Sequence, residues 1–441
     1  MQLRLFDGRF RAIYGGDSPA ALGRRTALSS GAVKYVVGTL NGGLLYTGFF
    51  MLYDIDIVGI SILMFVPYMA ALLSIFAPVV LERFPKRKGL LLGAKSLYYL
   101  LSILTITLLP PLIPDKAVLI PVCVVVLLIA NVLNCFCQAG FDAWYINFLP
   151  EYIKPDHFAF MTLIPALCGQ TLALIASFVV DTLSGGAQSV VLIGVRWLML
   201  ALGALDIWIC SRPAEVEYRH SVERIRFADI FRIPLSNRKF MGVLGIVCLW
   251  TFSYYITQST LSYYLLNDCK ASYTFISGMD MIYPILLFVF QPLWKKYLRK
   301  VSWLKAYEAS VLIYAVSYLI YGFVNARTYL PIMLLVRTMQ HLAGAGHSIT
   351  SANLIYLNTP DTDRTGYLSF YNVCTNVSIF LSMLASTVFV SFMNGASLTV
   401  GSMHFAPVQI LLFLSGVGQG IAWLIVHCKA DSLTPQNNVL A

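Results

Sequence analysis

Apolar runs long enough to cross a membrane recur along the whole of this sequence. A helix needs about 20 mainly apolar residues to cross a bilayer, because the hydrocarbon layer is about 30 Å thick and each residue rises about 1.5 Å. Only 12% of the 441 residues are charged, which is about half the share in a soluble domain. The runs predict an all-α membrane protein with twelve spans, at residues 35–53, 58–81, 90–110, 118–140, 158–180, 190–210, 241–265, 273–293, 304–324, 330–356, 368–392 and 408–426.

The positions of lysine and arginine predict how the chain is oriented. Cytoplasmic loops retain positive charge during insertion. With the N-terminus inside, 24 lysines and arginines fall on the cytoplasmic side and 3 in outer loops. The net charge of +10 is therefore spread along the membrane boundaries, whereas nucleic-acid binders gather their cations on one soluble face. We expect an integral protein of the cell (plasma) membrane with both termini in the cytoplasm and no nucleic-acid partner.

A polar stretch after the sixth span divides the chain into two halves. We expect a cytoplasmic lead at 1–32, a six-helix bundle at 33–210, a cytoplasmic linker at 211–240, a second bundle at 241–428 and a cytoplasmic tail at 429–441. The loop before the fifth span of each half has a similar sequence, PEYIKPDHFAF from Pro150 and PDTDRTGYLSF from Pro360. Pro78 and Pro292 likewise precede basic loops at matching places in the two halves. The halves are therefore predicted to be parallel repeats.

The loop between the second and third spans carries the sequence PVVLERFPKRK. It resembles the loop motif of the major facilitator superfamily (MFS) of secondary transporters. The acidic and basic positions of that motif are occupied by Glu82, Arg83, Lys86 and Arg87, and prolines replace its two glycines. The resemblance implies two six-helix bundles that give alternating access to a central site, with this loop closing the cytoplasmic side and Glu82 approaching the start of the eleventh span. The alternative is a basic loop that only sets topology.

Two charges inside the second half are predicted to meet. Counted from the outer ends of their spans, Asp280 and Arg337 both lie about 10 Å deep. Intramembrane charges usually face the bundle interior or water, so the two form either an outer gate or coupling site, or a buried structural pair. His341 lies one turn below Arg337 and is either a proton carrier or a packing residue. Arg196 and Asp206 lie in the sixth span, which is peripheral in the resembled fold, and Arg196 is expected to reach outward to the membrane surface.

The first, fourth, seventh and tenth helices line the centre of the resembled fold, so uncharged polar and aromatic groups dominate the predicted cavity, and the eleventh helix adds two asparagines. Because rings stack on sugar faces and amides bind hydroxyls, these residues favour a polar, mostly uncharged solute such as a sugar or glycoside. The alternative is hydrogen bonding between helices. The candidate substrate-binding residues are Asn41, Tyr46, Asn134, Gln138, Tyr254, Tyr255, Gln258, Gln340, Asn372 and Asn376.

Other chemistries leave weaker signals. The nine cysteines have no paired spacing, so we expect neither a metal site nor a disulfide framework. No nucleotide-binding loop follows a strand, so we expect no cofactor and an H+ or Na+ gradient as the energy source. Asp142, Glu151 and His157 gather near the inner ends of the fourth and fifth spans without the spacing of a catalytic site.

We therefore predict a secondary transporter of a small solute, in contact with membrane lipid, rather than an enzyme. Efflux of amphipathic drugs, a membrane-embedded enzyme and a non-transporting sensor are the alternatives.

Overall fold

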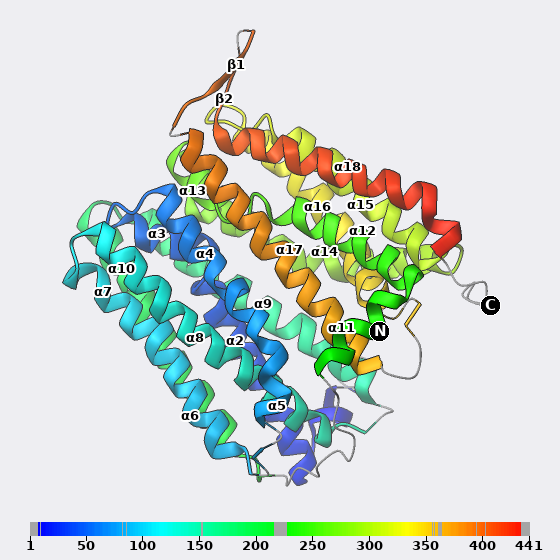
Figure 1. Ribbon diagram of the computed structural model, residues 1–441. Helices are drawn as coiled ribbons and strands as arrows, with labels where there is room; N and C mark the ends of the chain where they lie inside the picture. Colours follow the sequence, from blue (N-terminus) through cyan, green and yellow to red (C-terminus); the bar gives the residue numbers. More distant parts are fainter. Residues whose placement is uncertain are drawn as a thin grey trace. The chain divides into compact units, whose positions relative to one another are not determined.

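The computed structural model describes the chain at residue 8 and at residues 10–81, 83–84, 86–150, 153–215, 227–354, 356, 358–359, 364–393, 395–401 and 403–433. Over these residues the chain is helical apart from turns, loops and one two-stranded hairpin (Figure 1). The chain divides into two compact units. Unit 1 contains Met1–Ile55 and Leu73–Val222, and unit 2 contains Asp56–Leu72 and Glu223–Ala441.

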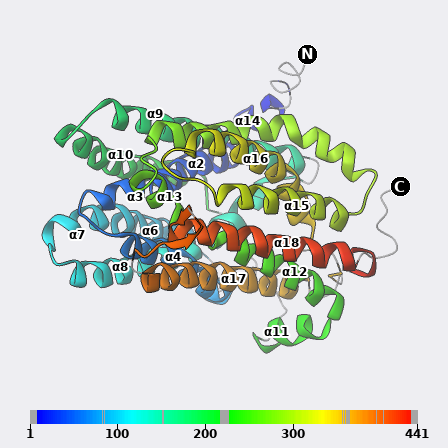
Figure 2. The ribbon, with the colours of Figure 1, turned by 90° about the horizontal axis from the view of Figure 1, so that it is seen from above.

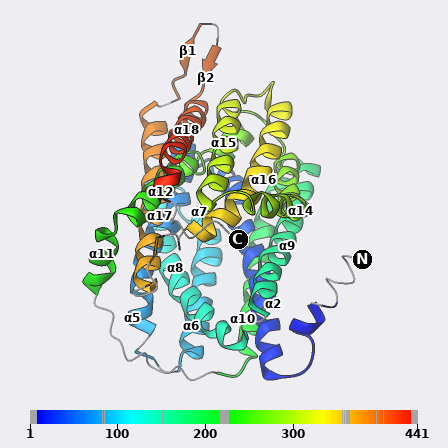
Figure 3. The ribbon, with the colours of Figure 1, turned by 90° about the vertical axis from the view of Figure 1, so that its right-hand side faces the viewer.

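Unit 1 is a bundle of helices. They are α2 (Pro19–Leu40), α3 (Gly43–Met51), α5 (Ala77–Leu81), α6 (Lys88–Tyr99), α7 (Ile106–Leu112), α8 (Lys116–Tyr145), α9 (Lys154–Thr182) and α10 (Gly186–Ser211), with a π-helical stretch, η2 (Leu100–Thr105), and a 3-10 turn, η3 (Ile146–Phe148). Helix α2 lies beside α9 (Figure 3) and also contacts α10, while α6 packs on α8 and α10.

Unit 2 holds the remaining helices and the hairpin. They are α4 (Ile57–Ala71), α11 (Phe227–Ser236), α12 (Arg238–Tyr255), α13 (Leu261–Asn267), α14 (Tyr273–Leu298), α15 (Trp303–Tyr321), α16 (Tyr329–Leu354), α17 (Arg364–Met393), α18 (Pro407–Leu433), β1 (Leu398–Val400) and β2 (Met403–Phe405). Helix α15 packs on both α16 and α18 (Figure 2), and α12 packs on α17 and α18. The antiparallel hairpin pairs Thr399 with His404 and joins α17 to α18.

Helix α4 belongs to unit 2 although it comes early in the chain. The rings of Phe65 and Phe380 lie 5.6 Å apart between α4 and α17. The Ser61 hydroxyl donates to the carbonyl oxygen of Ser259 at 3.3 Å. The domain boundaries expected from the sequence place this segment in the first bundle, whereas its contacts place Asp56–Leu72 with the second half of the chain.

The first helix starts earlier than the hydropathy pattern predicts. The predicted span begins at residue 35, but α2 begins at Pro19, so part of the expected polar lead is helical. Ser18 caps the helix by accepting a hydrogen bond from the Ala21 amide at 3.1 Å. A serine followed by proline at the first helical position is a strong start signal, which hydropathy alone does not detect.

Several of the predicted spans are interrupted or change their helical winding. The first span breaks at Asn41–Gly42, where Gly43 has a positive φ of 58° that glycine tolerates. The seventh breaks between α12 and α13 over residues 256–260, which are rich in β-branched and hydroxyl side chains that compete with helical hydrogen bonding. The second span continues as a 3-10 helix, η1 (Leu72–Phe76), and the third span contains the π-helical stretch η2.

The helices are long enough for a membrane protein. Among the described residues, seven helices could cross a membrane by length and composition, and α14 makes an eighth with a bend of 48°. Pro284 and Pro292 lie inside α14 and remove backbone donors there, which is a common cause of such bends. Four predicted spans remain. Two of them are broken, one into α2 and α3 and the other into α12 and α13, and the other two, α15 and α16, carry more polar residues.

Candidate transport site

The ion pair predicted inside unit 2 is present. Helices α14 and α16 pack on each other and carry Asp280 and Arg337. Arg337 Nη2 lies 3.6 Å from Asp280 Oδ1, and the two side chains are 21% and 39% exposed respectively. The two residues, which were predicted to meet because they lie at equal depth in their helices, therefore do form an ion pair. Neither side chain is fully buried.

Two hydrogen-bond donors beside this pair have no protein acceptor among the described residues. Arg337 Nη1 donates to Gln340 Oε1 at 3.4 Å, and Gln340 is buried. Arg337 Nε and Gln340 Nε2 are also buried but unpaired. A buried donor without an acceptor costs about 1–3 kcal/mol. The packing around α16 therefore leaves two hydrogen bonds unmade beside the ion pair.

His341 joins the two helices next to the ion pair. Its Nε2 donates to the carbonyl oxygen of Met279 at 2.8 Å, which places the proton of the neutral ring on Nε2. The imidazole lies 5.4 Å from the Tyr283 ring, between ring centres, and the residue is only 6% exposed. His341 thus fixes α16 against α14 one residue from Asp280.

A group of tyrosines, here called the tyrosine wall, lies beside Arg337. It consists of Tyr254 from α12 and Tyr314, Tyr318 and Tyr321 from α15. The ring of Tyr254 lies 5.7 Å from Tyr314 and 5.9 Å from Tyr318. Tyr254, Tyr318 and Tyr321 all interact electrostatically with the Arg337 guanidinium. Tyr314, Tyr318 and Tyr321 are buried, whereas Tyr254 is half-buried.

Gln258 extends the site into the break that follows α12. Its Nε2 donates to the Tyr318 hydroxyl at 3.4 Å. Tyr314, Tyr318 and Tyr321 were not predicted, although their i, i+4, i+7 spacing places them on one face of a helix and was a usable signal. The predicted residues that meet here are Tyr254, Gln258, Asp280, Arg337, Gln340 and His341.

Three other candidates in unit 2 have different surroundings. The ring of Tyr255 lies 5.7 Å from that of Tyr68 on α4. Asn376 uses its amide nitrogen to donate to the carbonyl oxygen of Asn372, one turn earlier in α17, at 2.8 Å. The predicted i, i+4 pair of asparagines therefore includes a hydrogen bond within its own helix.

Arg196 in unit 1 contradicts the expectation that it reaches outward. It is only 2% exposed. Its Nε donates to Thr107 Oγ1 at 3.0 Å, its Nη1 donates to Asn41 Oδ1, and its Nη2 donates to the carbonyl oxygens of Ser102 and Ile103 at 3.0 and 3.2 Å. Both carbonyls come from the π-helical η2, whose winding changes the direction of its backbone groups. A buried set of acceptors was available, so the guanidinium points inward.

Aromatic rings complete the surroundings of Arg196. The guanidinium lies 5.5 Å from the centre of the Tyr46 ring and 5.0 Å from that of Phe49. Both rings are buried in α3, immediately after the break at Asn41–Gly42. Two candidates for substrate binding, Asn41 and Tyr46, are thus in contact with Arg196.

A second charged pair in unit 1 was missed from the sequence. Lys95 Nζ lies 2.7 Å from Asp206 Oδ2, with side-chain exposures of 8% and 0%. Asp206 also accepts hydrogen bonds from the hydroxyls of Ser30, at 2.6 Å, and Tyr99. Asp206 is therefore buried and fully paired, although its helix was expected to be peripheral. Lys95 and Asp206 lie at similar distances from the inner ends of α6 and α10, so the depth argument that paired Asp280 with Arg337 also applies to them.

Gln138 connects two charged side chains of unit 1. Its Oε1 accepts a hydrogen bond from Lys34 Nζ, and its Nε2 donates to both carboxylate oxygens of Asp142, at 2.8 and 2.9 Å. Asn134 lies half-buried one turn earlier in α8. The amide of Gln138 is thus fully engaged between a lysine on α2 and an aspartate on its own helix.

The residues that could have formed a catalytic cluster have separate partners. Asp142 binds Gln138, whereas His157 Nδ1 lies 2.9 Å from the Tyr14 hydroxyl. Burial raises the pKa of Tyr14 well above its usual range, opposed by the charge of Arg24, so the hydroxyl stays protonated. Glu151 lies outside the described residues.

The basic loop before α6 contacts the segment that follows α10. The backbone amide of Lys88 donates to Glu215 Oε1, and its Nζ donates to the carbonyl oxygen of Pro213, both at 2.9 Å. Arg83 and Lys86 are exposed, and Arg87 Nε donates to the carbonyl oxygen of Phe84 at 2.9 Å. Glu82, the predicted gate carboxylate, lies outside the described residues.

The second half of the chain matches a known protein family. Residues 243–398 match the model of the Major Facilitator Superfamily. No curated protein matches the chain by sequence. The family match covers the helices that carry Tyr254, Asp280 and Arg337.

Solved structures with the same fold cover more than nine-tenths of the chain. A mutant form of the nucleoside transporter NupG gives a TM-score of 0.73 at 12% identity, covering 92% of this chain and 99% of that chain. A POT family transporter in complex with a thioalcohol-conjugated peptide gives 0.69 at 12% identity, covering 96% and 98%. A D-xylose-proton symporter gives 0.60 at 14% identity, also covering 96% and 98%. The protein is therefore an integral membrane protein with the twelve-span transporter fold of the major facilitator superfamily, and the predicted resemblance is confirmed.

Proposed function

We propose that this protein is a secondary active transporter that moves a small polar solute across the cell membrane by alternating access. The observation that carries the proposal is the partly exposed Asp280–Arg337 pair with two unpaired donors beside it. A fully satisfied structural pair would leave no such donors. Proteins of the same fold include a nucleoside transporter and a D-xylose-proton symporter, which supports a polar organic solute.

The chemistry of the site suggests how the solute is held. The Arg337 guanidinium, once released from Asp280, would donate to an oxygen of the solute. The half-buried Tyr254 would pack against the apolar face of its ring, and Gln258 would reach a further hydroxyl. This combination of amides, hydroxyls and rings favours a sugar or glycoside.

Asp280 is the proposed proton carrier. Protonation would remove its negative charge and release Arg337 to bind the solute, and loss of the proton would re-form the pair. The 39% exposure of the Asp280 side chain supports exchange with water. Because His341 holds the two helices together beside this carboxylate, its hydrogen bond would keep the pair aligned in both protonation states. The alternative coupling ion is Na+, and the transport experiment described below distinguishes the two.

The orientation follows from the positive charges. The loops rich in lysine and arginine, and with them both termini, would face the cytoplasm. In this orientation Arg83, Lys86 and Arg87 lie at the cytoplasmic end of the second span, where they would act with Glu82 in closing the inner side.

Transport by purified protein in lipid vesicles tests the proposal. A thermal-stability screen of sugars, nucleosides, peptides and organic acids first finds a ligand, because a ligand that binds the folded state raises its melting temperature. With that solute, Asp280→Asn should abolish accumulation driven by a pH gradient while exchange of labelled for unlabelled solute continues. Asp431→Asn, the same change at an exposed position of α18, is the control and should transport normally. Unchanged accumulation by Asp280→Asn would reject the proton role, and accumulation driven by Na+ alone would replace it.

Efflux of amphipathic drugs is the second candidate, because the tyrosine wall also suits aromatic ligands. Competition separates the two functions. A solute transporter should be inhibited by close analogues of its solute, whereas a drug exporter should be inhibited by unrelated aromatic compounds.

A further inference from the structure

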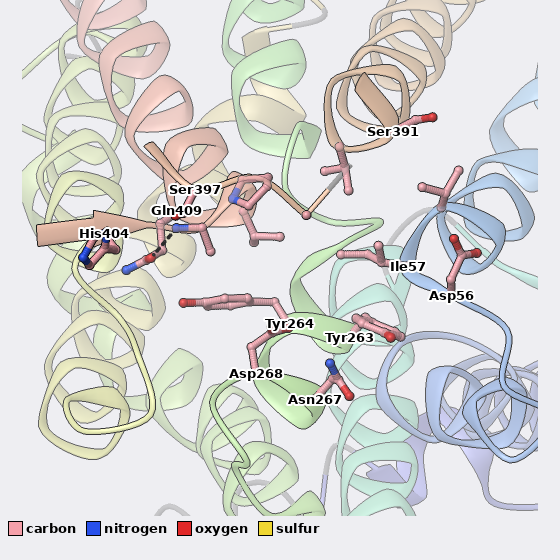
Figure 4. Close-up of a pocket in the computed structure, with 16 residues that line it drawn as sticks. Asp56, Ile57, Tyr263, Tyr264, Asn267, Asp268, Ser391, Ser397, His404 and Gln409 are labelled. Carbon is pink, nitrogen blue, oxygen red and sulfur yellow. Dashed lines mark hydrogen bonds between the residues drawn. The ribbon is translucent and has the colours of Figure 1, made fainter. Parts of the chain in front are cut away.

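A pocket of about 560 Å³ lies in unit 2, away from the Asp280–Arg337 pair. Figure 4 shows it between the start of α4, the short helix α13, the end of α17 and the loop that leads from the hairpin into α18. None of the lining residues belongs to α14, α15 or α16, which carry that ion pair and most of the tyrosine wall. The pocket is therefore a separate candidate site.

The charge of the pocket lining is negative. Asp56 and Asp268 both line it, and no lysine or arginine does. Figure 4 shows Tyr263 between the two aspartates, and both carboxylates interact electrostatically with its hydroxyl. Partial burial raises the pKa of Asp268, although a hydrogen bond from Asn267 and the charge of Lys270 oppose the shift. The lining thus carries two carboxylates and no lysine or arginine, which favours a positively charged ligand.

The buried side chains at the base of the pocket already have partners. The Tyr264 hydroxyl donates to the carbonyl oxygen of Val324 at 2.9 Å. Gln409 Nε2 donates to the same carbonyl oxygen at 2.8 Å, and its Oε1 accepts from the Ala406 amide at 2.8 Å. The base is therefore fixed, and recognition falls to the charged and aromatic groups around it.

The size and geometry favour an organic cation over a metal ion. Among the described residues, no group of three His, Cys, Asp or Glu side chains is placed to hold a metal. The volume is many times the roughly 30 Å³ that one water molecule occupies in the liquid. Ammonium groups form charge-assisted hydrogen bonds with carboxylates and are attracted to tyrosine faces.

We propose that this pocket binds a small organic amine, with ammonium groups at Asp56 and Asp268 and the carbon chain over Tyr263. In the orientation proposed above, the hairpin end of unit 2 faces the outside, so the amine would arrive from the external solution. Binding at this pocket requires no transport and extends the function proposed for Asp280 and Arg337.

Calorimetric titration of the purified protein with putrescine tests this site. 1,4-Butanediol has the same chain length without the charges and should not bind. Asp56→Asn and Asp268→Asn should each weaken putrescine binding by about 5- to 10-fold, the loss expected for one charge-assisted contact of about 1–1.4 kcal/mol, and the double variant should lose it. Asp431→Asn should bind as the wild type does.

Folding of these variants can be checked independently. Asp56 caps α4 by accepting from the Gly59 amide at 2.9 Å, and asparagine caps helices as well as aspartate does, so Asp56→Asn should keep the wild-type melting temperature to within a few degrees. Equal affinity for putrescine in the double variant, equal binding of the diol, or no saturable binding by the wild type would each overturn the proposal. Solute transport in the same preparation would show that the proposed transport function survives such a result.

Discussion

The two units each contain a charged pair inside a membrane span, and the pairs differ in how completely they are satisfied. In unit 1, Lys95 and Asp206 are 2.7 Å apart, nearly inaccessible, and surrounded by hydroxyl groups that complete the hydrogen bonds of the carboxylate. In unit 2, Asp280 and Arg337 are 3.6 Å apart, partly exposed, and flanked by unpaired donors. A buried, complete network fixes a packing arrangement, whereas an accessible, incomplete one can exchange partners. The difference assigns a structural role to the first pair and supports a functional role for the second.

The largest expected effect comes from breaking the pair of unit 1. Asp206→Ala would leave the Lys95 ammonium buried without a counter-charge, and removing one partner of such a pair costs about 3–5 kcal/mol. Denaturant unfolding in detergent measures this loss. Lys95→Met combined with Asp206→Leu removes both charges and should recover much of the stability. If Asp206→Ala keeps the wild-type free energy of unfolding, the unit 1 pair is not the more stabilising of the two pairs.

Breaking the pair of unit 2 should cost much less stability. Asp280→Asn removes an accessible ion pair, and such pairs contribute about 0–1 kcal/mol. The same unfolding measurement on Asp280→Asn and Asp206→Ala compares the units directly. A loss of several kcal/mol in Asp280→Asn would place this pair in the structural class and remove the main support for its role in transport.

The smallest expected effect concerns a charge outside the spans. Burial raises the pKa of Asp268, so the folded protein binds this proton more tightly than the unfolded chain does. The ionised carboxylate therefore slightly destabilises the folded state above the folded pKa, and this penalty disappears as the pH falls below the unfolded value of about 3.9. Asp268→Asn should raise the melting temperature slightly at pH 7, with the gain shrinking toward pH 4. A gain that grows in acid would contradict the sign of the shift.

The sequence predicted those parts of the site that depend on one helix at a time or on depth. Asp280 and Arg337 were paired because their helices start at the same side of the membrane and each residue adds a fixed rise. Tyr254 and Gln258 were predicted on one helix face by their i, i+4 spacing, but Gln258 lies in the break after α12 and meets the site through Tyr318. The same reasoning could have found Tyr314, Tyr318 and Tyr321, as well as the match between Lys95 and Asp206.

The error at Arg196 has a different cause. Hydropathy and the peripheral place of the sixth helix in the resembled fold both indicated an outward arginine. Its acceptors come from the π-helical carbonyls of Ser102 and Ile103 and from Asn41 at a helix break. Neither irregularity is encoded by a single residue type, so the inward direction of this side chain could not be read from the sequence.

By itself the sequence determined the class of protein, the number of spans and the family resemblance, because transfer of apolar residues into lipid and the length of a helix depend on local composition. The tertiary structure alone decided which polar groups are satisfied, since a hydrogen bond between helices depends on where each helix breaks, bends and packs. It placed α4 in unit 2, turned Arg196 inward and left Arg337 with an unpaired donor.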